Sequence, residues 1–159
     1  KEVLYRREMV PAHLQLLPGA HALFTALALQ GIKTGILTNA PTDNINAALD
    51  ALDLRSQFPG SAILNGAALE RDGLTAKPAP DGLRVLARRF DVTLDECIYI
   101  GDSPADFAAA GAAPMASIGV CTTYEAAQLM ALGAARCITD FTELTVDALT
   151  TLVQGRSTR

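Results

Sequence analysis

Short apolar runs alternate with amphipathic helical segments along this chain, and this alternation limits the fold more than any other feature. The run 32–37 is short and apolar, and it is followed by Ile45, Leu49 and Leu52 at helical spacing. Strands that alternate with helices in this way favour a mostly parallel sheet with helices on both faces. The sequence therefore predicts an α/β fold of three layers, similar to a Rossmann fold.

The pattern places the individual elements along the chain. We expect strands at 32–37, 62–64, 97–100, 116–120 and 136–139, and helices at 18–29, 45–52, 83–90, 104–110, 122–133 and 140–155. Thr122 with Glu125, and Asp140 with Glu143, are spaced as capping boxes for the last two helices. Segment 65–80 is expected to be a loop, because Asn65 and Gly66 open it and its residues are mostly polar.

Composition excludes several classes of partner. The 159 residues are 50% hydrophobic and carry a net charge of −4, with no basic run and only 5% aromatic residues. Binding to nucleic acid is not expected, because it relies on basic patches and on aromatic stacking. No apolar run approaches the length of a membrane span, and the first ten residues lack the apolar centre of a signal peptide, so we expect no membrane partner and a cytoplasmic location.

The three cysteines do not suggest a metal site. Cys97, Cys121 and Cys137 are far apart in the sequence and each lies in or beside an apolar run. Zinc sites need cysteine or histidine ligands at close spacing, which this chain lacks. We expect buried, reduced thiols.

Two carboxylates follow the strand expected at 97–100. The strand ends at Gly101, and Asp102 and Asp106 come next, in a loop and the start of a helix. Open α/β sheets build their sites at the carboxyl ends of parallel strands. Carboxylates suit Mg²⁺, which binds one or two of them together with water and phosphate oxygens. This pair predicts chemistry on a phosphate group.

Two other loops carry residues that suit the same chemistry. Thr38 and Asn39 follow a strand, and Lys77 precedes a helix. The free N–H groups at a helix start attract anions, and each of the three loops opens a helix. A hydroxyl, an ammonium and a metal-binding carboxylate that met at one point would hold a phosphoryl group and neutralise its charge.

Each of these residues also has a purely structural explanation when it is taken alone. Ser103, Pro104 and Asp106 fit a helix start, with serine as the cap and proline at the first position. Thr38 and Asn39 fit a turn. The combination therefore carries the prediction, rather than any one member.

Three other polar residues are less informative. Lys77 alone would fit a solvated loop lysine, and His13 and His21 are expected at the surface, apart from the three loops. Ser103 lacks the flanking glycines of a hydrolase nucleophile, so we do not assign it that role.

Three motifs resemble the haloacid dehalogenase superfamily, and its phosphoglycolate phosphatase-like branch most closely. The resemblance runs from about residue 18 to about residue 144, and it rests on the segments Leu-Thr-Asn at 37–39, Lys-Pro-Ala-Pro-Asp at 77–81 and Ile-Gly-Asp-Ser-Pro-Ala-Asp at 100–106. Their order and spacing match motifs two, three and four of that superfamily.

The resemblance implies a role for each site residue. Thr38, assisted by Asn39, would bind an oxygen of the transferred phosphoryl group. Lys77 would pair with that group and with the nucleophile. Asp102 would bind Mg²⁺ directly, and Asp106 would orient a metal-bound water or Lys77. The implied activity is hydrolysis of the phosphate ester of a small metabolite, such as phosphoglycolate.

One motif of the superfamily is missing. Motif one is an Asp-x-Asp after the first strand, and no Asp-x-Asp occurs in these 159 residues. The carboxylate that would attack phosphorus must then lie upstream, and the 159 residues alone are expected to be inactive. The resemblance also implies that the absent first strand is central, between the strands that end at Leu37 and Ile100. We expect 1–17 to be the end of a cap segment and its linker, 18–155 the core and 156–159 a frayed tail.

Two other functions remain open on the sequence. A sugar-phosphate mutase of the same superfamily has the same core and differs in its cap. A non-catalytic phosphate-binding or interaction domain would lack the nucleophile altogether. A dinucleotide-binding fold is not expected, because the chain has no Gly-x-Gly-x-x-Gly turn. Oligomeric state is not predicted by any feature of the sequence.

Overall fold

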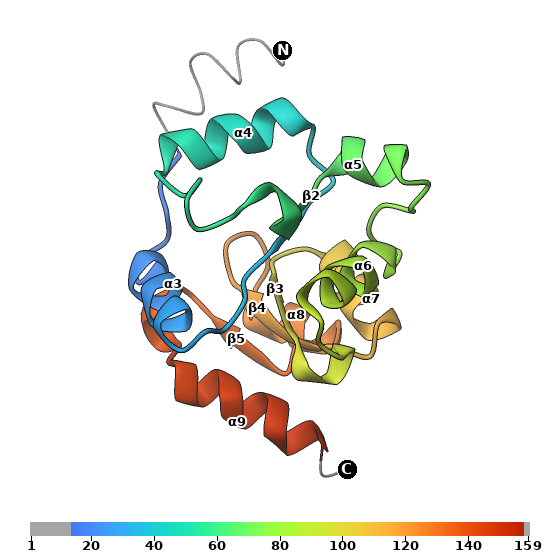
Figure 1. Cartoon of the computed structure of the whole chain (residues 1–159). Helices are drawn as coiled ribbons and strands as arrows, with labels where there is room; N and C mark the ends of the chain where they lie inside the picture. Colours follow the sequence, from blue (N-terminus) through green and yellow to red (C-terminus); the bar gives the residue numbers. More distant parts are fainter. Residues whose placement is uncertain (1–13, 158–159) are drawn as a thin grey trace.

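Parallel strands lie between two layers of helices in residues 14–157, the part of the chain that the computed structural model describes (Figure 1). The strands are β1 (Ile36–Leu37), β2 (Ile63–Leu64), β3 (Ile98–Gly101), β4 (Ala116–Val120) and β5 (Arg136–Ile138). Every pair of hydrogen-bonded strands is parallel. The expected α/β class is confirmed, and β4 has the bounds that the sequence predicts.

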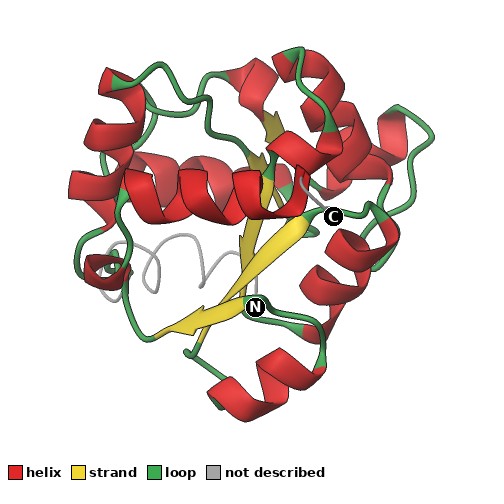
Figure 2. Ribbon diagram, turned by 90° about the horizontal axis from the view of Figure 1, so that it is seen from below, coloured by secondary structure: helices red, strands yellow, loops and turns green. Residues whose placement is uncertain are grey.

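One helical layer consists of α3 (Ala20–Leu29), α4 (Thr42–Ala51) and α9 (Val146–Ser157). Leu27 of α3 and Leu149 of α9 share an apolar cluster with Ile118 of β4. Leu49 of α4 belongs to a neighbouring cluster, against which Ile36 of β1 packs. Helices therefore cover the same face of both strand groups. Figure 2 shows from below that helices surround the strands.

The opposite layer consists of α5 (Gly66–Arg71), α6 (Asp81–Phe90), α7 (Pro104–Ala112) and α8 (Ala126–Ala131). Leu83 of α6 and Ala109 of α7 pack with Leu37 and Leu64, the second residues of β1 and β2. Successive strand residues thus face opposite layers, as the pleat of a strand requires. The core is divided between the two faces of the strands.

The strands form two separate groups. In one, β1 pairs with β2; in the other the order is β3-β4-β5. Within the described residues no backbone ladder joins β1 to β3, although the Tyr99 hydroxyl of β3 lies 3.5 Å from the Leu37 carbonyl oxygen of β1. This separation agrees with the expectation that these residues lack a central strand between β1 and β3.

Two elements near the middle of the chain differ from the prediction. The expected strand 32–37 shortens to β1, and Ile32 is exposed. The expected loop 65–80 contains α5, because the side-chain oxygen of Asn65 accepts a hydrogen bond from the backbone N–H of Ala68 and caps this helix. Asparagine before glycine is a turn signal, but asparagine is equally a strong helix cap.

The last two helices begin later than predicted. α8 starts at Ala126, and its capping box is formed by Glu125 and Gln128 rather than by Thr122 and Glu125. Asp140 caps only the short 3₁₀ helix η4 (Phe141–Glu143), by accepting from the backbone N–H of Thr142. The final helix follows as α9 and runs to Ser157, two residues past the predicted end.

Other expectations concern the cysteines and the ends of the chain. All three cysteines are free, but each is half-buried rather than buried.

Most of the predicted cap segment 1–17, and His13 with it, lies outside the described residues, as do the last two residues of the predicted tail. Among the helices of residues 14–157, none combines the length and the apolar character that a membrane crossing needs.

Candidate functional site

The loops that follow β1 and precede α6 are joined side by side. The side-chain amide of Asn39 donates to the carbonyl oxygen of Lys77 at 2.9 Å, and its oxygen accepts from the backbone N–H of Lys77 at 3.1 Å. This two-bond contact fixes the backbone of Lys77 against the end of β1. The structure therefore brings together two of the three predicted loops.

The third loop reaches the same point through an ion pair. The ammonium of Lys77 lies 2.6 Å from Oδ1 of Asp106, which is the third residue of α7. The two side chains are only 12% and 5% exposed. A pair this enclosed is screened little by solvent, and removing either partner would leave the other charge uncompensated.

Both oxygens of Asp106 are held by protein donors. Oδ1 accepts from Lys77 Nζ and from the Tyr99 hydroxyl (2.9 Å). Oδ2 accepts from the backbone N–H groups of Asp102 (3.1 Å) and Ser103 (3.0 Å), and from the Ser103 hydroxyl (2.7 Å). Asp106 therefore links the lysine to the loop after β3. Of the two roles that the resemblance implies for Asp106, these contacts favour the orientation of Lys77.

The carboxyl of Asp106 is held in its ionised form. Burial raises its pKa, but the hydrogen bonds from Lys77, Ser103 and Tyr99, with the charge of Lys77, outweigh burial and leave the pKa below its ordinary value. At neutral pH Asp106 is therefore a carboxylate. The positive charge of Lys77 is available to an anionic group that approaches it.

Gly101 allows the turn that positions Asp106. A Cβ atom at residue 101 would lie 2.6 Å from the Cβ of Asp106 and 2.7 Å from its Oδ2, closer than such atoms approach. Only glycine lets the end of β3 pass this near to the carboxylate. The glycine of the predicted motif thus has a steric reason.

Asp102 is the accessible carboxylate of the site. Its side chain is exposed, and its Oδ2 accepts a hydrogen bond from the hydroxyl of Thr122 at 3.0 Å. A hard cation such as Mg²⁺ accepts a single protein carboxylate, with water and phosphate oxygens completing its shell. Within residues 14–157 no group of three or more His, Cys, Asp or Glu side chains could hold a metal. The donors present fit Mg²⁺ bound through Asp102, and they do not form a closed cage.

Thr38 is the residue before Asn39, which binds the backbone of Lys77. Its backbone N–H donates to the carbonyl oxygen of Leu64, which continues the pairing of β1 with β2. Its hydroxyl oxygen accepts from the N–H of Ala40 at 3.1 Å, so the hydroxyl proton can still be donated to a ligand. His21, by contrast, is exposed on α3 and belongs to none of these contacts.

Two contributors to the site were not predicted, Tyr99 and Thr122, whereas the contact between Ser103 and Asp106 is the helix cap that the sequence suggests. Tyr99 lies between two isoleucines in an apolar strand, so the sequence alone predicts no function for its hydroxyl. Strand alternation gives a signal, because Ile98 and Ile100 pack on one face while Tyr99 points to the other. Thr122 is the second residue after β4, at the same edge of the sheet as Asp102.

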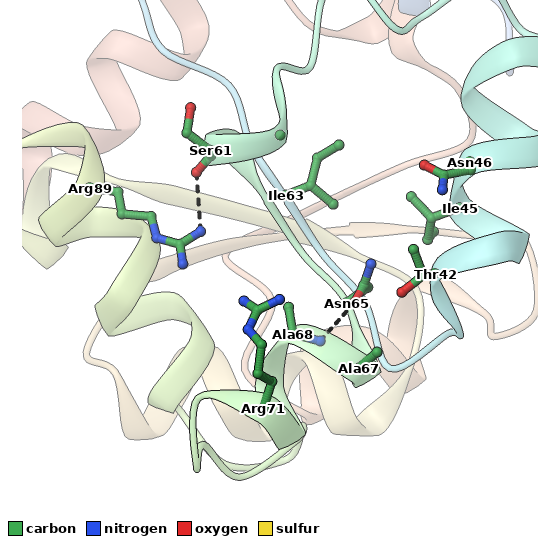
Figure 3. A pocket seen from close by; sticks show the side chains of 11 residues that line it. Thr42, Ile45, Asn46, Ser61, Ile63, Asn65, Ala67, Ala68, Arg71 and Arg89 are labelled. Atoms are coloured by element: carbon green, nitrogen blue, oxygen red, sulfur yellow. Dashed lines mark hydrogen bonds between the residues drawn. The ribbon is translucent and has the colours of Figure 1, made fainter.

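A cavity lies away from these residues. It measures about 640 Å³ and runs along β2, between α4, α5 and α6 (Figure 3). Its polar lining includes Asn65, Arg71 and Arg89. Arg71 pairs with the neighbouring Asp72, and Arg89 donates to the Ser61 carbonyl oxygen, as the dashed line in Figure 3 marks. None of the predicted site residues lines this cavity.

Several known proteins are similar to this chain in sequence and in fold. The model of the haloacid dehalogenase-like hydrolase family matches residues 2–114. A phosphoglycolate phosphatase of Rhodospirillum rubrum is 35% identical over 127 residues, which are 80% of this chain and 50% of that protein. A phosphoglycolate phosphatase of Escherichia coli strain K12 is 32% identical over 76% of this chain and 45% of its own length. The chain thus spans about half the length of these curated relatives.

A solved structure supports the same assignment. The crystal structure of a HAD hydrolase, family IA, variant 3, from Entamoeba histolytica has a TM-score of 0.87 and 25% identity, with 96% of this chain and 67% of that one covered. The family model spans well over half of the chain. On these grounds the chain belongs to the haloacid dehalogenase-like hydrolase family.

Proposed function

We propose that this chain supplies the phosphate-binding and metal-binding part of the active site of a Mg²⁺-dependent phosphate monoester hydrolase. The observation that carries the proposal is the enclosed Lys77 and Asp106 pair, tied by Asn39 to the end of β1. It presents a fixed positive charge where three strand and helix ends meet. A phosphoryl group gains charge on its oxygens during transfer, and a preorganised ammonium stabilises that charge.

Each site residue has one task in this proposal. Thr38 donates its hydroxyl proton to a phosphoryl oxygen, and Asn39 keeps the Lys77 loop in place. Lys77 pairs with the phosphoryl group, and Asp106 orients Lys77 and the backbone of Asp102. Asp102, held by Thr122, is the direct ligand of Mg²⁺, and any contact of Asp106 with the metal passes through water. The metal would supply charge neutralisation on the phosphate oxygens.

The nucleophile of the proposed reaction comes from residues upstream of this chain. Two observations support this: within residues 14–157 no strand pairs with the edges of β1 and β3 that face each other, and Asp-x-Asp is absent from the 159 residues. An upstream carboxylate oxygen would bond to phosphorus while the ester P–O bond breaks and the leaving alcohol takes a proton. Water would then split the aspartyl phosphate, which releases inorganic phosphate and restores the carboxylate.

The proposed substrate is a small phosphorylated metabolite, and phosphoglycolate is the first to test. Two relatives of at least 30% identity are phosphoglycolate phosphatases. A β-phosphoglucomutase of Clostridium difficile has a TM-score of 0.72, but at 23% identity the likeness concerns the fold alone. Hydrolysis is therefore proposed ahead of mutase activity, in a protein of the cytoplasm.

The test compares the full-length protein with the 159-residue chain. Release of inorganic phosphate from 2-phosphoglycolate and from a panel of phosphate esters, with a hexose 1-phosphate among them, is measured with Mg²⁺ present. The full-length protein should release phosphate, the 159 residues alone should not, and Lys77→Ala should lower the rate about 100-fold or more. Lys33→Ala, an exposed lysine, is the control.

Other outcomes would replace the proposal. Isomerisation of the hexose 1-phosphate with little free phosphate would indicate the mutase. Full-length protein that binds phosphate but turns over no ester would indicate a non-catalytic binding domain. Lys77→Ala at the wild-type rate would remove the residue on which the proposal rests.

A further inference from the structure

Tyr99 projects from β3 into the site that the motif residues form. Its neighbours Ile98 and Ile100 pack against the cluster on the α3 and α9 side. The Tyr99 ring packs instead against the cluster that contains Leu37 and residues of α6 and α7. Its hydroxyl lies 3.0 Å from Lys77 Nζ and 2.9 Å from Asp106 Oδ1. The hydroxyl thus bridges the two members of the ion pair.

The direction of these hydrogen bonds follows from the groups themselves. An ammonium only donates, and an ionised carboxylate only accepts. Lys77 therefore donates to the Tyr99 oxygen, and Tyr99 donates its single proton to Asp106. Two of the three N–H bonds of Lys77 are then directed, one to Asp106 and one to Tyr99, and a third remains for another acceptor.

The surroundings keep the Tyr99 hydroxyl protonated. Burial first, and then the charge of Asp106, raise the pKa of this phenol well above its ordinary value. The hydroxyl therefore carries its proton at neutral pH and can donate it to Asp106. Nζ of Lys77 also lies 5.7 Å from the centre of the Tyr99 ring, within the range of a cation–π contact.

We infer that Tyr99 is a positioning residue: its hydroxyl fixes the Lys77 ammonium against Asp106 and turns the remaining N–H bond toward the phosphoryl group. This inference rests on the proposed function for its phosphoryl partner. Without the hydroxyl, the ion pair alone would leave the ammonium free to rotate about its bond to Asp106. The site would keep the positive charge of Lys77, but the N–H bonds of the ammonium would no longer be held in one direction.

The kinetic test uses Tyr99→Phe in the full-length protein, because this change removes only the hydroxyl. The value of kcat/KM should fall about tenfold, the usual effect of one hydrogen bond to a charged group. In a Lys77→Ala background, Tyr99→Phe should cause no further loss, because its effect passes through Lys77. Tyr124→Phe is the matched control, since no hydrogen bond of the Tyr124 hydroxyl is found among the described residues.

A general structural role would give a different result. It would lower activity by the same factor with and without Lys77, and that outcome would overturn the inference. Tyr99→Phe within twofold of the wild-type kcat/KM would overturn it as well. Thermal unfolding of each variant shows whether a loss of activity comes from unfolding of the protein or from a displaced Lys77 ammonium.

A second measurement needs no catalysis. An ammonium held by two acceptors exchanges its protons slowly, so Lys77 should give a resolved lysine ¹⁵N–¹H signal in the full-length protein, assigned by its loss in Lys77→Arg. Tyr99→Phe should broaden or remove that signal. A signal that is absent from the wild type, or unchanged in Tyr99→Phe, contradicts the inference. Failure to hydrolyse any ester would instead count against the proposed function alone.

Discussion

Asn39 pairs with both backbone polar groups of Lys77, at 2.9 and 3.1 Å, across 38 residues of sequence. The side-chain amide therefore acts as a strand partner for a single residue and joins two loops without a sheet. The position of the Lys77 ammonium depends on this contact as well as on Asp106.

Replacement of Asn39 by alanine removes both bonds to Lys77. We expect Asn39→Ala to lower the free energy of unfolding by about 1–2 kcal/mol, since two modest hydrogen bonds are lost at an exposed position. The full-length variant should also show a raised KM, because the loop of Lys77 is loosened. Urea unfolding and steady-state kinetics measure the two effects. Asn44→Ala, a change of the same kind on α4, should alter neither.

Addition of a methyl group at Gly101 should displace Asp106. The new Cβ would lie 2.6 Å from the Asp106 Cβ, so we expect Gly101→Ala to destabilise the protein by about 1–3 kcal/mol and to lower activity. Gly111→Ala is the matched control, because a Cβ there meets nothing within 4 Å in α7. It should stabilise slightly, since alanine is the better helix former. Equal melting temperatures for the two variants would contradict the steric argument.

The lowered pKa of Asp106 predicts how stability depends on pH. In the folded protein the pKa lies below its ordinary value of 3.8, so the carboxylate stabilises the fold above that value. This contribution is lost as pH falls through the lower pKa of the folded state. Urea unfolding from about pH 7 down to about pH 3 should show the loss in wild type.

Asp106→Asn should flatten that acid limb and lower stability at neutral pH. A neutral amide leaves the enclosed Lys77 charge unpaired, which typically costs about 3–5 kcal/mol. The control is Asp53→Asn, an exposed aspartate with positive φ, a conformation that asparagine tolerates. An Asp106→Asn variant as stable as wild type at neutral pH would show that the pair contributes nothing.

The hydroxyl of Thr122 should matter for metal binding rather than for the fold. Thr122→Val removes its hydrogen bond to Asp102 and keeps the shape of the side chain. We expect the Mg²⁺ concentration for half-maximal activity to rise about tenfold, the effect of losing an outer partner of a metal ligand, with kcat at saturating Mg²⁺ preserved. Thr25→Val on α3 is the control. An unchanged Mg²⁺ requirement would mean that Thr122 does not orient Asp102.

The sequence predicts the order of strands and helices because their apolar patterns differ, and β4 is correct to the residue. It misplaces features that depend on competition between local contacts. Asn65 caps a helix instead of forming a turn, and the Thr122 hydroxyl contacts Asp102 instead of capping α8. Asn65 and Thr122 could each form either of two local contacts, and the tertiary structure determines which one forms.

The residues of the site likewise fall into those that the sequence predicts and those that it does not. Lys77 and Asp106 could be expected to meet, because Asp106 follows the carboxyl end of a parallel strand and Lys77 lies in a loop that opens a helix, where anions bind. Tyr99 could not be assigned a role in the same way, since an aromatic residue in an apolar strand is ordinarily core. Its part depends on which face β3 turns toward α6 and α7, and the spacing of chemical groups alone does not give that.

The role of Asp102 as a metal ligand is tested by the rate of phosphate release from phosphoglycolate by the full-length protein, measured as a function of Mg²⁺ for wild type and Asp102→Asn. We expect hydrolysis that requires Mg²⁺ and that falls about 100-fold or more in Asp102→Asn, while Asp53→Asn retains the wild-type rate. Undiminished, metal-independent hydrolysis by Asp102→Asn would contradict this role.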